Sequence, residues 1–271
     1  DEKIRVFELG ASDFINKPFS VSELLARLKV HLTNRLLNET VVEQQRQTND
    51  ELRTAQTMQL QLMPDDEQIA LASQHYGVHV SHYFETSSLM GGDCWGMRPI
   101  DQSRMALFML DFSGHGITAA LNVFRIHSLI HELLPIAGSP GQFLTTLNRQ
   151  IHPLLARSAF ATMFYGVMDT AANSFEYSAA ASTPVLMLGK SGRAEWLENR
   201  GVPLGCTADA SYDSYCTPLA SGDALVLFSD CYIETKCKDD SLITEEDIVS
   251  VAQAARASAA PGHSKAILDA L

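Results

Sequence analysis

The 271-residue chain has no cysteine framework, no long apolar run and no excess of basic residues. Its five cysteines are odd in number and form no CxxC pair, which argues against a disulfide scaffold and favours reduced thiols. No apolar run approaches the roughly 18 residues of a membrane span. The net charge of −12 argues against a nucleic-acid or anionic-membrane surface. Because the N-terminus is also not signal-like, we expect a cytoplasmic protein with no nucleic-acid or membrane partner.

Glycine and proline are absent from Ser20 to Met63, a segment rich in Leu, Glu, Gln and Arg. A continuous helix there would be about 65 Å long at ~1.5 Å per residue. Its apolar residues recur at spacings near three and four, and they are Leu25, Leu28, Leu32, Val41, Leu52, Ala55 and Leu62. An isolated helix needs a partner for its apolar face, so we expect a parallel coiled-coil homodimer through residues 20–63. A single helix lying on its own domain is the alternative.

A short motif precedes this helix. Gly10-Ala11-Ser12-Asp13-Phe14-Ile15 is followed by Lys17-Pro18-Phe19. The motif resembles the last strand of a response-regulator receiver domain, which implies a lysine that contacts a phosphoryl group and a residue before proline that is often cis. We therefore expect a helix, a short strand and a turn over the first 20 residues. The expected organisation is a receiver remnant over 1–32 and a coiled-coil linker helix over 33–64.

Beyond Pro64 the pattern changes to short apolar runs bounded by turn residues. The expected strands are Val78–Phe84, Met105–Leu110, Thr162–Met168, Phe175–Ala180, Val185–Leu188, Ser214–Pro218 and Ala224–Phe228. The expected helices are Thr118–Leu134, Pro140–Leu155 and Glu245–Ala257. Many strands with two long central helices predict an α+β domain over 65–271, with sheets packed together and helices outside.

Three aspartates lie at the mouths of predicted strands. Asp111 and Asp230 each end an apolar run, and Asp93 follows a glycine pair. A lone aspartate in such a place is usually a turn or cap residue. Three of them, brought together, would repel one another without a cation. Since hard divalent ions favour oxygen ligands, the set predicts an Mg²⁺- or Mn²⁺-dependent hydrolase.

Five short motifs surround these aspartates. They are Gly91-Gly92-Asp93, Asp111-Phe112-Ser113-Gly114-His115-Gly116, Pro203-Leu204-Gly205, Ser221-Gly222-Asp223 and Ser229-Asp230. In this order they resemble bacterial PPM-type Ser/Thr phosphatases of the RsbU/SpoIIE-like group, and residues 51–64 resemble the helix that leads into that domain. The resemblance implies a PPM-like α/β sandwich of two antiparallel sheets flanked by helices.

The resemblance also implies a site with two Mn²⁺ or Mg²⁺ ions. Asp111 would bridge both ions, and the carbonyl of Phe112 would bind one of them. Asp230 would serve the second ion, and Asp93 would act on the first, directly or through water. Paired cations activate a shared water for attack on phosphorus. That chemistry needs no nucleophilic side chain, which fits the absence of a Cys-x5-Arg loop.

By the same resemblance, the chain is the effector of a two-component response regulator. Its substrate would be phosphoserine or phosphothreonine on a STAS-type anti-sigma-factor antagonist. The alternative is a catalytically weak adaptor that binds a sigma factor or its regulator. Retention of three mutually repelling carboxylates favours the enzyme.

The chain departs from the family pattern at three points. Ala179-Ala180-Ala181-Ser182 stands where relatives carry Asn-Ala-Gly-His, and Asp230-Cys231 stands where they carry Asp-Gly. The C-terminal Asp-Asp pair that supplies the last ligand of the second metal is not recognised before Leu271. We expect these departures to affect the level of activity and the second metal.

Several residues could be taken for catalytic groups, but a structural role is the simpler interpretation of each. His127 and His131 have the spacing of a zinc-protease pair, but no glutamate follows His127, so we expect helix-surface or core histidines. Ser113 and His115 are expected to shape the loop around the metal site. Cys231 is expected to be an inert small residue, and Glu234 is expected to be structural.

Overall fold

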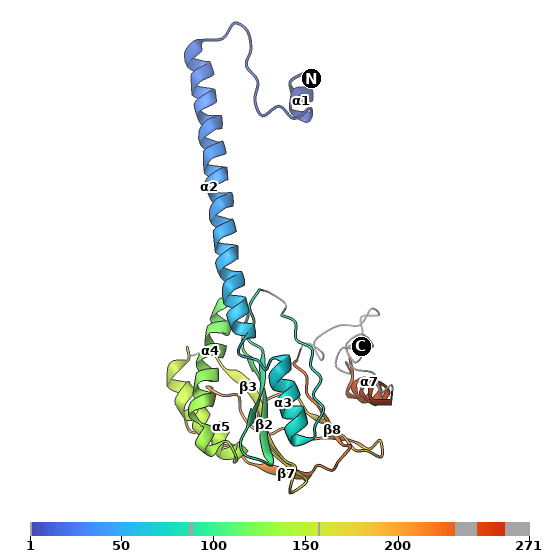
Figure 1. Cartoon of the computed structure of the whole chain (residues 1–271). Helices are drawn as coiled ribbons and strands as arrows, with labels where there is room; N and C mark the ends of the chain where they lie inside the picture. The colour runs from blue at the N-terminus through green and yellow to red at the C-terminus, as the bar shows by residue number, and fades with distance from the viewer. Residues whose placement is uncertain (1, 87–88, 157, 231–242, 258–271) are drawn as a thin grey trace. The chain divides into compact units, whose positions relative to one another are not determined.

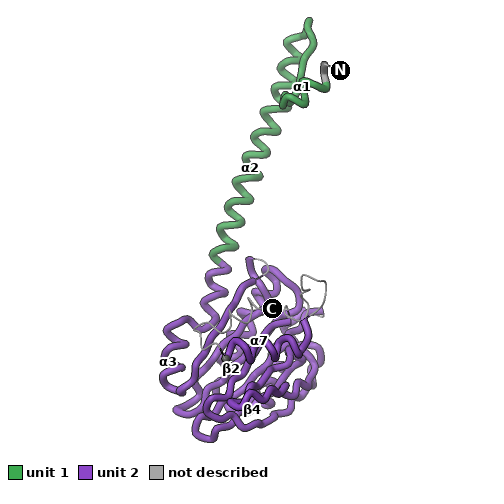
Figure 2. Tube along the Cα trace, turned by 90° about the vertical axis from the view of Figure 1, so that its right-hand side faces the viewer, with its two compact units in different colours: residues 1–54 green, residues 55–271 purple. Residues whose placement is uncertain are grey.

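A computed structural model describes residues 2–86, 89–156, 158–230 and 243–257. The chain divides into two compact units, Asp1–Thr54 and Ala55–Leu271 (Figure 2). Helix α1 spans Glu2–Glu8, and α2 spans Val21–Leu60, so α2 begins in the first unit and ends in the second. None of the helices in the described part of the chain combines the length and the apolar character of a membrane span.

The long glycine-free helix is confirmed. α2 is uninterrupted over its 40 residues, and its first turn is capped by the Ser20 hydroxyl, which accepts a hydrogen bond from the Glu23 amide at 3.1 Å. Most of its apolar residues are exposed, with Leu25 and Leu32 each at 59%, whereas Leu52 is half-buried. The coiled-coil dimer stays a prediction, because an exposed apolar face does not identify what covers it.

The short strand expected before Lys17 does not form. In the described part of the first unit, residues 9–20 have no strand assignment, because a strand needs a neighbour for its backbone hydrogen bonds. The peptide bond between Lys17 and Pro18 is cis, as the receiver resemblance implies. Asp13 instead meets α2, where the Arg27 guanidinium donates to its carboxylate at 2.8 and 2.9 Å.

The second unit contains two antiparallel sheets. The first has five strands in the order β1-β2-β3-β4-β7, which are Cys94–Pro99, Arg104–Phe112, Ala161–Asp169, Ser174–Ala180 and Tyr215–Pro218. The second has three strands in the order β6-β5-β8, which are Ala194–Trp196, Leu186–Leu188 and Ala224–Val226. Every pairing is antiparallel, and β2 and β3 form the longest ladder, from Arg104 opposite Asp169 to Phe112 opposite Ala161.

In the described part of the second unit, the sheets are accompanied by helices α3 (Asp66–Tyr76), α4 (Ile117–Glu132), α5 (Pro140–Ile151) and α7 (Glu245–Ala257). Two short 3-10 turns follow α4 and α5 at Leu134–Ile136 and His152–Leu154. α4 and α5 pack on one face of the five-stranded sheet (Figure 1). α7 packs on the three-stranded sheet. The order of layers is therefore helices, sheet, sheet, helix, which confirms the predicted α+β sandwich.

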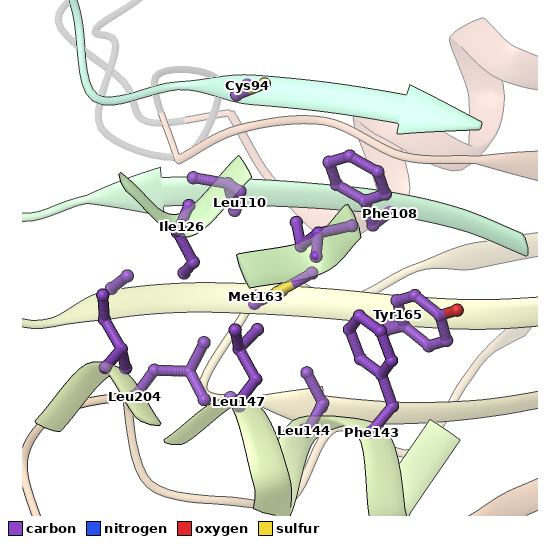
Figure 3. Close-up of a cluster of buried hydrophobic side chains, with 14 of the residues drawn as sticks. Cys94, Phe108, Leu110, Ile126, Phe143, Leu144, Leu147, Met163, Tyr165 and Leu204 are labelled. Atoms are coloured by element: carbon purple, nitrogen blue, oxygen red, sulfur yellow. The ribbon is translucent and has the colours of Figure 1, made fainter. Parts of the chain in front are cut away.

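Alternation along β2 and β3 separates two hydrophobic cores. Phe108 and Leu110 point to the helix side, where Tyr165 stacks on Phe143 of α5 at 3.9 Å between ring centroids (Figure 3). The alternate residues point to the space between the sheets, where Met105 packs with α3 and with the aromatic residues of β4. A third cluster lies between β5 and α7. Successive strand residues point to opposite faces, so each face of the five-stranded sheet supports its own core.

Two strand glycines make room for aromatic rings. Gly96 on β1 pairs with Phe108 on β2, and a Cβ added to Gly96 would lie 2.4 Å from Cζ of that ring. A Cβ added to Gly166 on β3 would lie 2.2 Å from Cζ of Phe175. Each ring therefore covers a glycine where another residue would carry its own side chain.

The structure corrects several boundaries drawn from the sequence. Val78–Phe84 is not a strand, although Val78 and Val80 pack against the core between the sheets. α3, β1 and β6 were not expected. α3 begins with a capping box in which the Asp65 side chain accepts from the Gln68 amide at 2.8 Å. The other predicted strands and helices form, with ends shifted by up to four residues.

Candidate active site

Asp111 is the second-last residue of β2. Phe112 and Leu110 on either side of it are buried in the helix-side core, so Asp111 points to the opposite face of the sheet. Its register partner is Thr162 on β3. The predicted strand-end position of Asp111 is therefore confirmed, and its carboxylate lies at the edge of the space between the two sheets.

The glycine pair brings Asp93 beside Asp111. The Phe112 amide donates to the Gly92 carbonyl at 3.1 Å. A Cβ on Gly92 would lie 2.3 Å from the Phe112 oxygen and 2.9 Å from Oδ1 of Asp111, so only glycine allows this approach. The carboxyl groups of Asp93 and Asp111 are hydrogen-bonded to each other.

The surroundings of Asp93 disfavour its negative charge. Burial, followed by the charge of Asp230, raises the pKa of Asp93 to about 6, and the hydrogen bond with Asp111 opposes this shift. Oδ1 of Asp93 is buried and has no hydrogen-bond partner among the residues that the structure describes. A buried carboxylate oxygen with no protein partner and two neighbouring acids is an arrangement that a cation would stabilise.

A cavity of about 270 Å³ contains all three aspartates. Asp230 is exposed and reaches it through the segment that follows β8. The cavity is lined by Asp93, Met109, Leu110, Asp111, Thr162, Ala181, Ser182, Thr183, Pro184, Ser229 and Asp230. The three motifs that are far apart in the sequence therefore meet at one site.

The donor set fits a hard divalent ion. The Asp93 and Asp111 carboxylates are oxygen donors that line the cavity. Phe112 does not line it, and its only oxygen donor is the backbone carbonyl. Among the residues that the structure describes, no three His, Cys, Asp or Glu side chains are arranged to hold one ion by themselves. The protein would therefore contribute few ligands for each ion, with water or substrate oxygen completing the coordination, as is usual for Mg²⁺.

Residues 101–271 match the family model of Stage II sporulation protein E (SpoIIE). The match covers more than half of the chain and includes Asp111 and Asp230. The chain belongs to the SpoIIE family.

Two Bacillus subtilis (strain 168) proteins are similar to this SpoIIE family member. Phosphoserine phosphatase RsbP is 28% identical over 174 residues, which cover 60% of this chain and 43% of RsbP. Phosphoserine phosphatase RsbU is 30% identical over 161 residues, which cover 56% of this chain and 48% of RsbU. The chain thus spans under half the length of these two relatives.

A solved structure shares the fold. The SiaA-PP2C domain of Pseudomonas aeruginosa superposes with a TM-score of 0.72 at 17% identity, over 83% of this chain and 89% of that one. Together with the family match, the superposition confirms the predicted PPM-like sandwich. The chain carries a PPM-type serine/threonine phosphatase domain.

The loop after Asp111 is shaped by glycines and by Ser113. Gly114 and Gly116 have φ of 93° and 78°, in the left-handed region that glycine tolerates, and Gly116 precedes α4. The Ser113 amide donates to the Phe160 carbonyl at 2.9 Å, and the Phe160 amide donates to the Ser113 hydroxyl at 3.0 Å. Ser113 is therefore a loop-shaping residue, as predicted. His115 is exposed and does not line the cavity.

Two residues of the Ala179–Ser182 segment, where the chain departs from its family pattern, line the cavity: Ala181 and Ser182. Ala181 has φ of 52°, a conformation that favours glycine, at the position where the family pattern has glycine. Its neighbour Ser182 is buried, and the Asn199 amide donates to the Ser182 carbonyl. The Thr183 hydroxyl donates to the Phe228 carbonyl, which ties this part of the cavity lining to the segment that leads to Asp230.

The two histidines of α4 contact Arg98 on β1. One Arg98 nitrogen lies 2.9 Å from Nε2 of His127 and 2.8 Å from Nε2 of His131. Burial, then the charge of Arg98, then His131 lower the pKa of His127 to about 4. His127 also donates to the Leu62 carbonyl. His127 is thus a core histidine and His131 a helix-surface histidine, which confirms the simpler interpretation.

Sequence reasoning missed Gln59 as a residue of this site. It lies within residues 51–64, the stretch that resembles the helix leading into the domain, and its side chain is buried against Gly91. A glutamine in a polar helix gives no signal of burial, so only the folded chain identifies it. Cys231 and Glu234, for which simple roles were expected, lie outside the described residues.

Proposed function

We propose that the chain is a metal-dependent phosphoprotein phosphatase. The observation that carries this proposal is the contact between the Asp93 and Asp111 carboxyl groups inside a cavity that Asp230 also lines. A shared fold is not by itself evidence of catalysis. Three acidic side chains held together despite their mutual repulsion support a catalytic site.

The roles proposed for the residues are those that the family resemblance implies, and the shared cavity supports them. Asp111 and Asp93, with the Phe112 carbonyl, would hold one Mn²⁺ or Mg²⁺ ion, and Asp111 with Asp230 would hold a second. When bound, the ions would neutralise phosphate charge and lower the pKa of a shared water. Gly92 keeps the two strand ends close enough for the carboxylates to meet, because any Cβ there would collide with the Phe112 carbonyl.

The chemistry proposed for the substrate is a phosphoserine or phosphothreonine ester on a regulatory protein, such as a STAS-type anti-sigma-factor antagonist. Both curated relatives are named phosphoserine phosphatases, which supports the ester class. Thr162 and Thr183 line the cavity of about 270 Å³ beside the aspartates, where a phosphorylated side chain would bind. Neither feature selects one phosphoprotein.

We also propose that residues 1–32 derive from a receiver domain and that the chain is a response-regulator effector. Support comes from the motif Gly10–Ile15 with Lys17-Pro18-Phe19 alone. Dimerisation through residues 20–63 belongs to the same proposal. It is supported by the exposed apolar residues of α2, which include Leu28 at 47% and Leu32 at 59%.

Hydrolysis of p-nitrophenyl phosphate with and without Mn²⁺ tests the proposed activity. Asp111→Asn should abolish Mn²⁺-dependent turnover and keep the fold, since removing one acid also relieves repulsion. Asp209→Asn, at an exposed loop position, is the matched control and should keep turnover. Near-parental turnover in Asp111→Asn would refute the bridging role. A folded parent without Mn²⁺-dependent turnover would favour the adaptor instead.

A further inference from the structure

The C-terminal end of α2 carries one buried side chain, that of Gln59. No other residue of this helix is buried, and Gln59 is 3% exposed. Burying a primary amide costs free energy unless its donor and its acceptor both find partners. The contacts of Gln59 therefore indicate what this end of the helix holds in place.

Both polar groups of the Gln59 amide contact one residue. Nε2 donates to the Gly91 carbonyl at 2.7 Å, and the Gly91 amide donates to Oε1 at 3.4 Å. Gly91 receives from this one side chain the pair of hydrogen bonds that a neighbouring strand would otherwise supply. The backbone just before Asp93 is thus fixed by a side chain rather than by a ladder.

The other side of the same segment is fixed by β2. Gly92 accepts from the Phe112 amide at 3.1 Å and leaves no room for a Cβ beside the Phe112 carbonyl. Gly91 and Gly92 therefore lie between Gln59 and the end of β2. Asp93 follows directly, with one carboxylate oxygen buried and without a hydrogen-bond partner in the part of the chain that the structure describes.

We propose that Gln59 is a positioning residue for Asp93, acting through the Gly91 backbone. With the amide in place, the Asp93 carboxylate is held toward Asp111 in the cavity. Without it, both backbone groups of Gly91 lose their partner and Asp93 loses its anchor. The inference rests on the proposed function, because its readout is the affinity of the site for a divalent cation.

Three variants test this role. Gln59→Met keeps the side-chain length without the amide, and Gln59→Glu keeps an acceptor for the Gly91 amide but removes the donor. Gln61→Met is the matched control, since Gln61 is exposed two residues further along the chain. Partners that orient metal ligands change metal affinity by about 10–100-fold. We expect Gln59→Met and Gln59→Glu to weaken Mn²⁺ binding in calorimetry at least about tenfold, and Gln61→Met to bind like the parent.

Two further readouts separate positioning from packing. Amide hydrogen exchange from Gly91 to Asp93 should rise in both Gln59 variants, and kcat at saturating Mn²⁺ should return to within about threefold of the parent, because the cation itself then holds Asp93. A lower thermal midpoint with unchanged Mn²⁺ affinity and unchanged exchange at Asp93 would show a packing role and overturn the inference. If Gln59→Met does not fold, Gln59→Glu decides by the same measurements.

The two proposals fail in different ways. A parent that neither binds Mn²⁺ nor hydrolyses a phosphate ester refutes the proposed function, and the positioning role with it. A parent that does both, beside a Gln59→Met variant of parental Mn²⁺ affinity, refutes the positioning role alone.

Discussion

Apolar side chains are mostly exposed in residues 1–54, whereas many are buried in residues 55–271. In the first unit Leu25, Leu32 and Leu37 are 58–59% exposed, whereas in the second Leu144 and Leu147 are fully buried at 0%. The second unit has its own cores between its layers. Apolar burial is the main favourable term in folding, so the second unit is stable by its own packing and the first needs a cover for its apolar face.

The largest expected effect is a cavity in the second unit. Leu147→Ala should lower the free energy of unfolding by about 2–5 kcal/mol, because it removes a fully buried side chain from the core beneath α5. Leu37→Ala in the first unit removes the same atoms from a side chain that is 58% exposed and should change it by less than about 0.5 kcal/mol. Urea unfolding measures both. Equal losses of unfolding free energy in the two variants would contradict the difference between the two units.

The next effect concerns what covers α2. The parent is expected to be a dimer at tens of micromolar, and Leu28→Glu/Leu32→Glu should weaken association at least about 100-fold, or about 2.8 kcal/mol, by placing charges in the apolar seam. Light scattering measures the mass, and Leu37→Glu, outside the predicted seam, should leave it unchanged. A monomeric parent, or a double variant that still dimerises, would leave the helix as a spacer.

A smaller effect depends on pH and belongs to the second unit. The pKa of His127 falls from 6.5 to about 4 on folding, so between these values the unfolded chain binds the extra proton and stability decreases as pH falls. The loss should be on the order of 1–2 kcal/mol after solvent screening.

Unfolding by urea at pH 7.5 and 5.0 measures this loss. His127→Gln should flatten the pH dependence, because it removes the group that takes up the proton. His75→Gln, at an exposed histidine at the end of α3, should keep it. A parental slope in His127→Gln would assign the loss to another group.

The smallest effect is expected at the ion pairs of the first unit. Arg27 contacts both Asp13 and Glu23, but all three side chains are partly exposed, and exposed pairs contribute little. Arg27→Ala should therefore leave the unfolding midpoint of the second unit unchanged, as should Arg193→Ala, which removes an exposed pair within that unit. A clear shift from Arg27→Ala alone would mean that the first unit supports the second.

Apolar runs bounded by turn residues made the long strands predictable, and strands without such a run were missed. β2, β3 and β4 are such runs, and their ends were placed within two residues of those observed. β1 was missed because Gly96 has no side chain to enter the pattern and the Phe108 ring takes its place. Val78–Phe84 alternates without pairing, since alternation reports which side chains are buried and not which backbone groups are bonded.

Only part of the candidate site could be predicted from the sequence. The strand-end positions of Asp111 and Asp93 follow from local pattern and glycine chemistry, which a sequence shows directly. Their contact depends on the register of β1 with β2, where Cys94 pairs with Leu110, and register is set by the whole sheet. The roles of Gln59 and Thr183 arise from hydrogen bonds to residues 32 and 45 positions away, which no local pattern encodes.

The two glycines under aromatic rings give the domain built-in spectroscopic markers. The α-proton of Gly96 that takes the place of a Cβ lies against the Phe108 ring, and that of Gly166 lies against the Phe175 ring, so ring currents should move both resonances upfield. Phe108 belongs to the core on the helix side and Phe175 to the core between the sheets. Two resolved glycine signals in a proton–carbon spectrum would thus report the packing of each face of the five-stranded sheet separately, without any label or substitution.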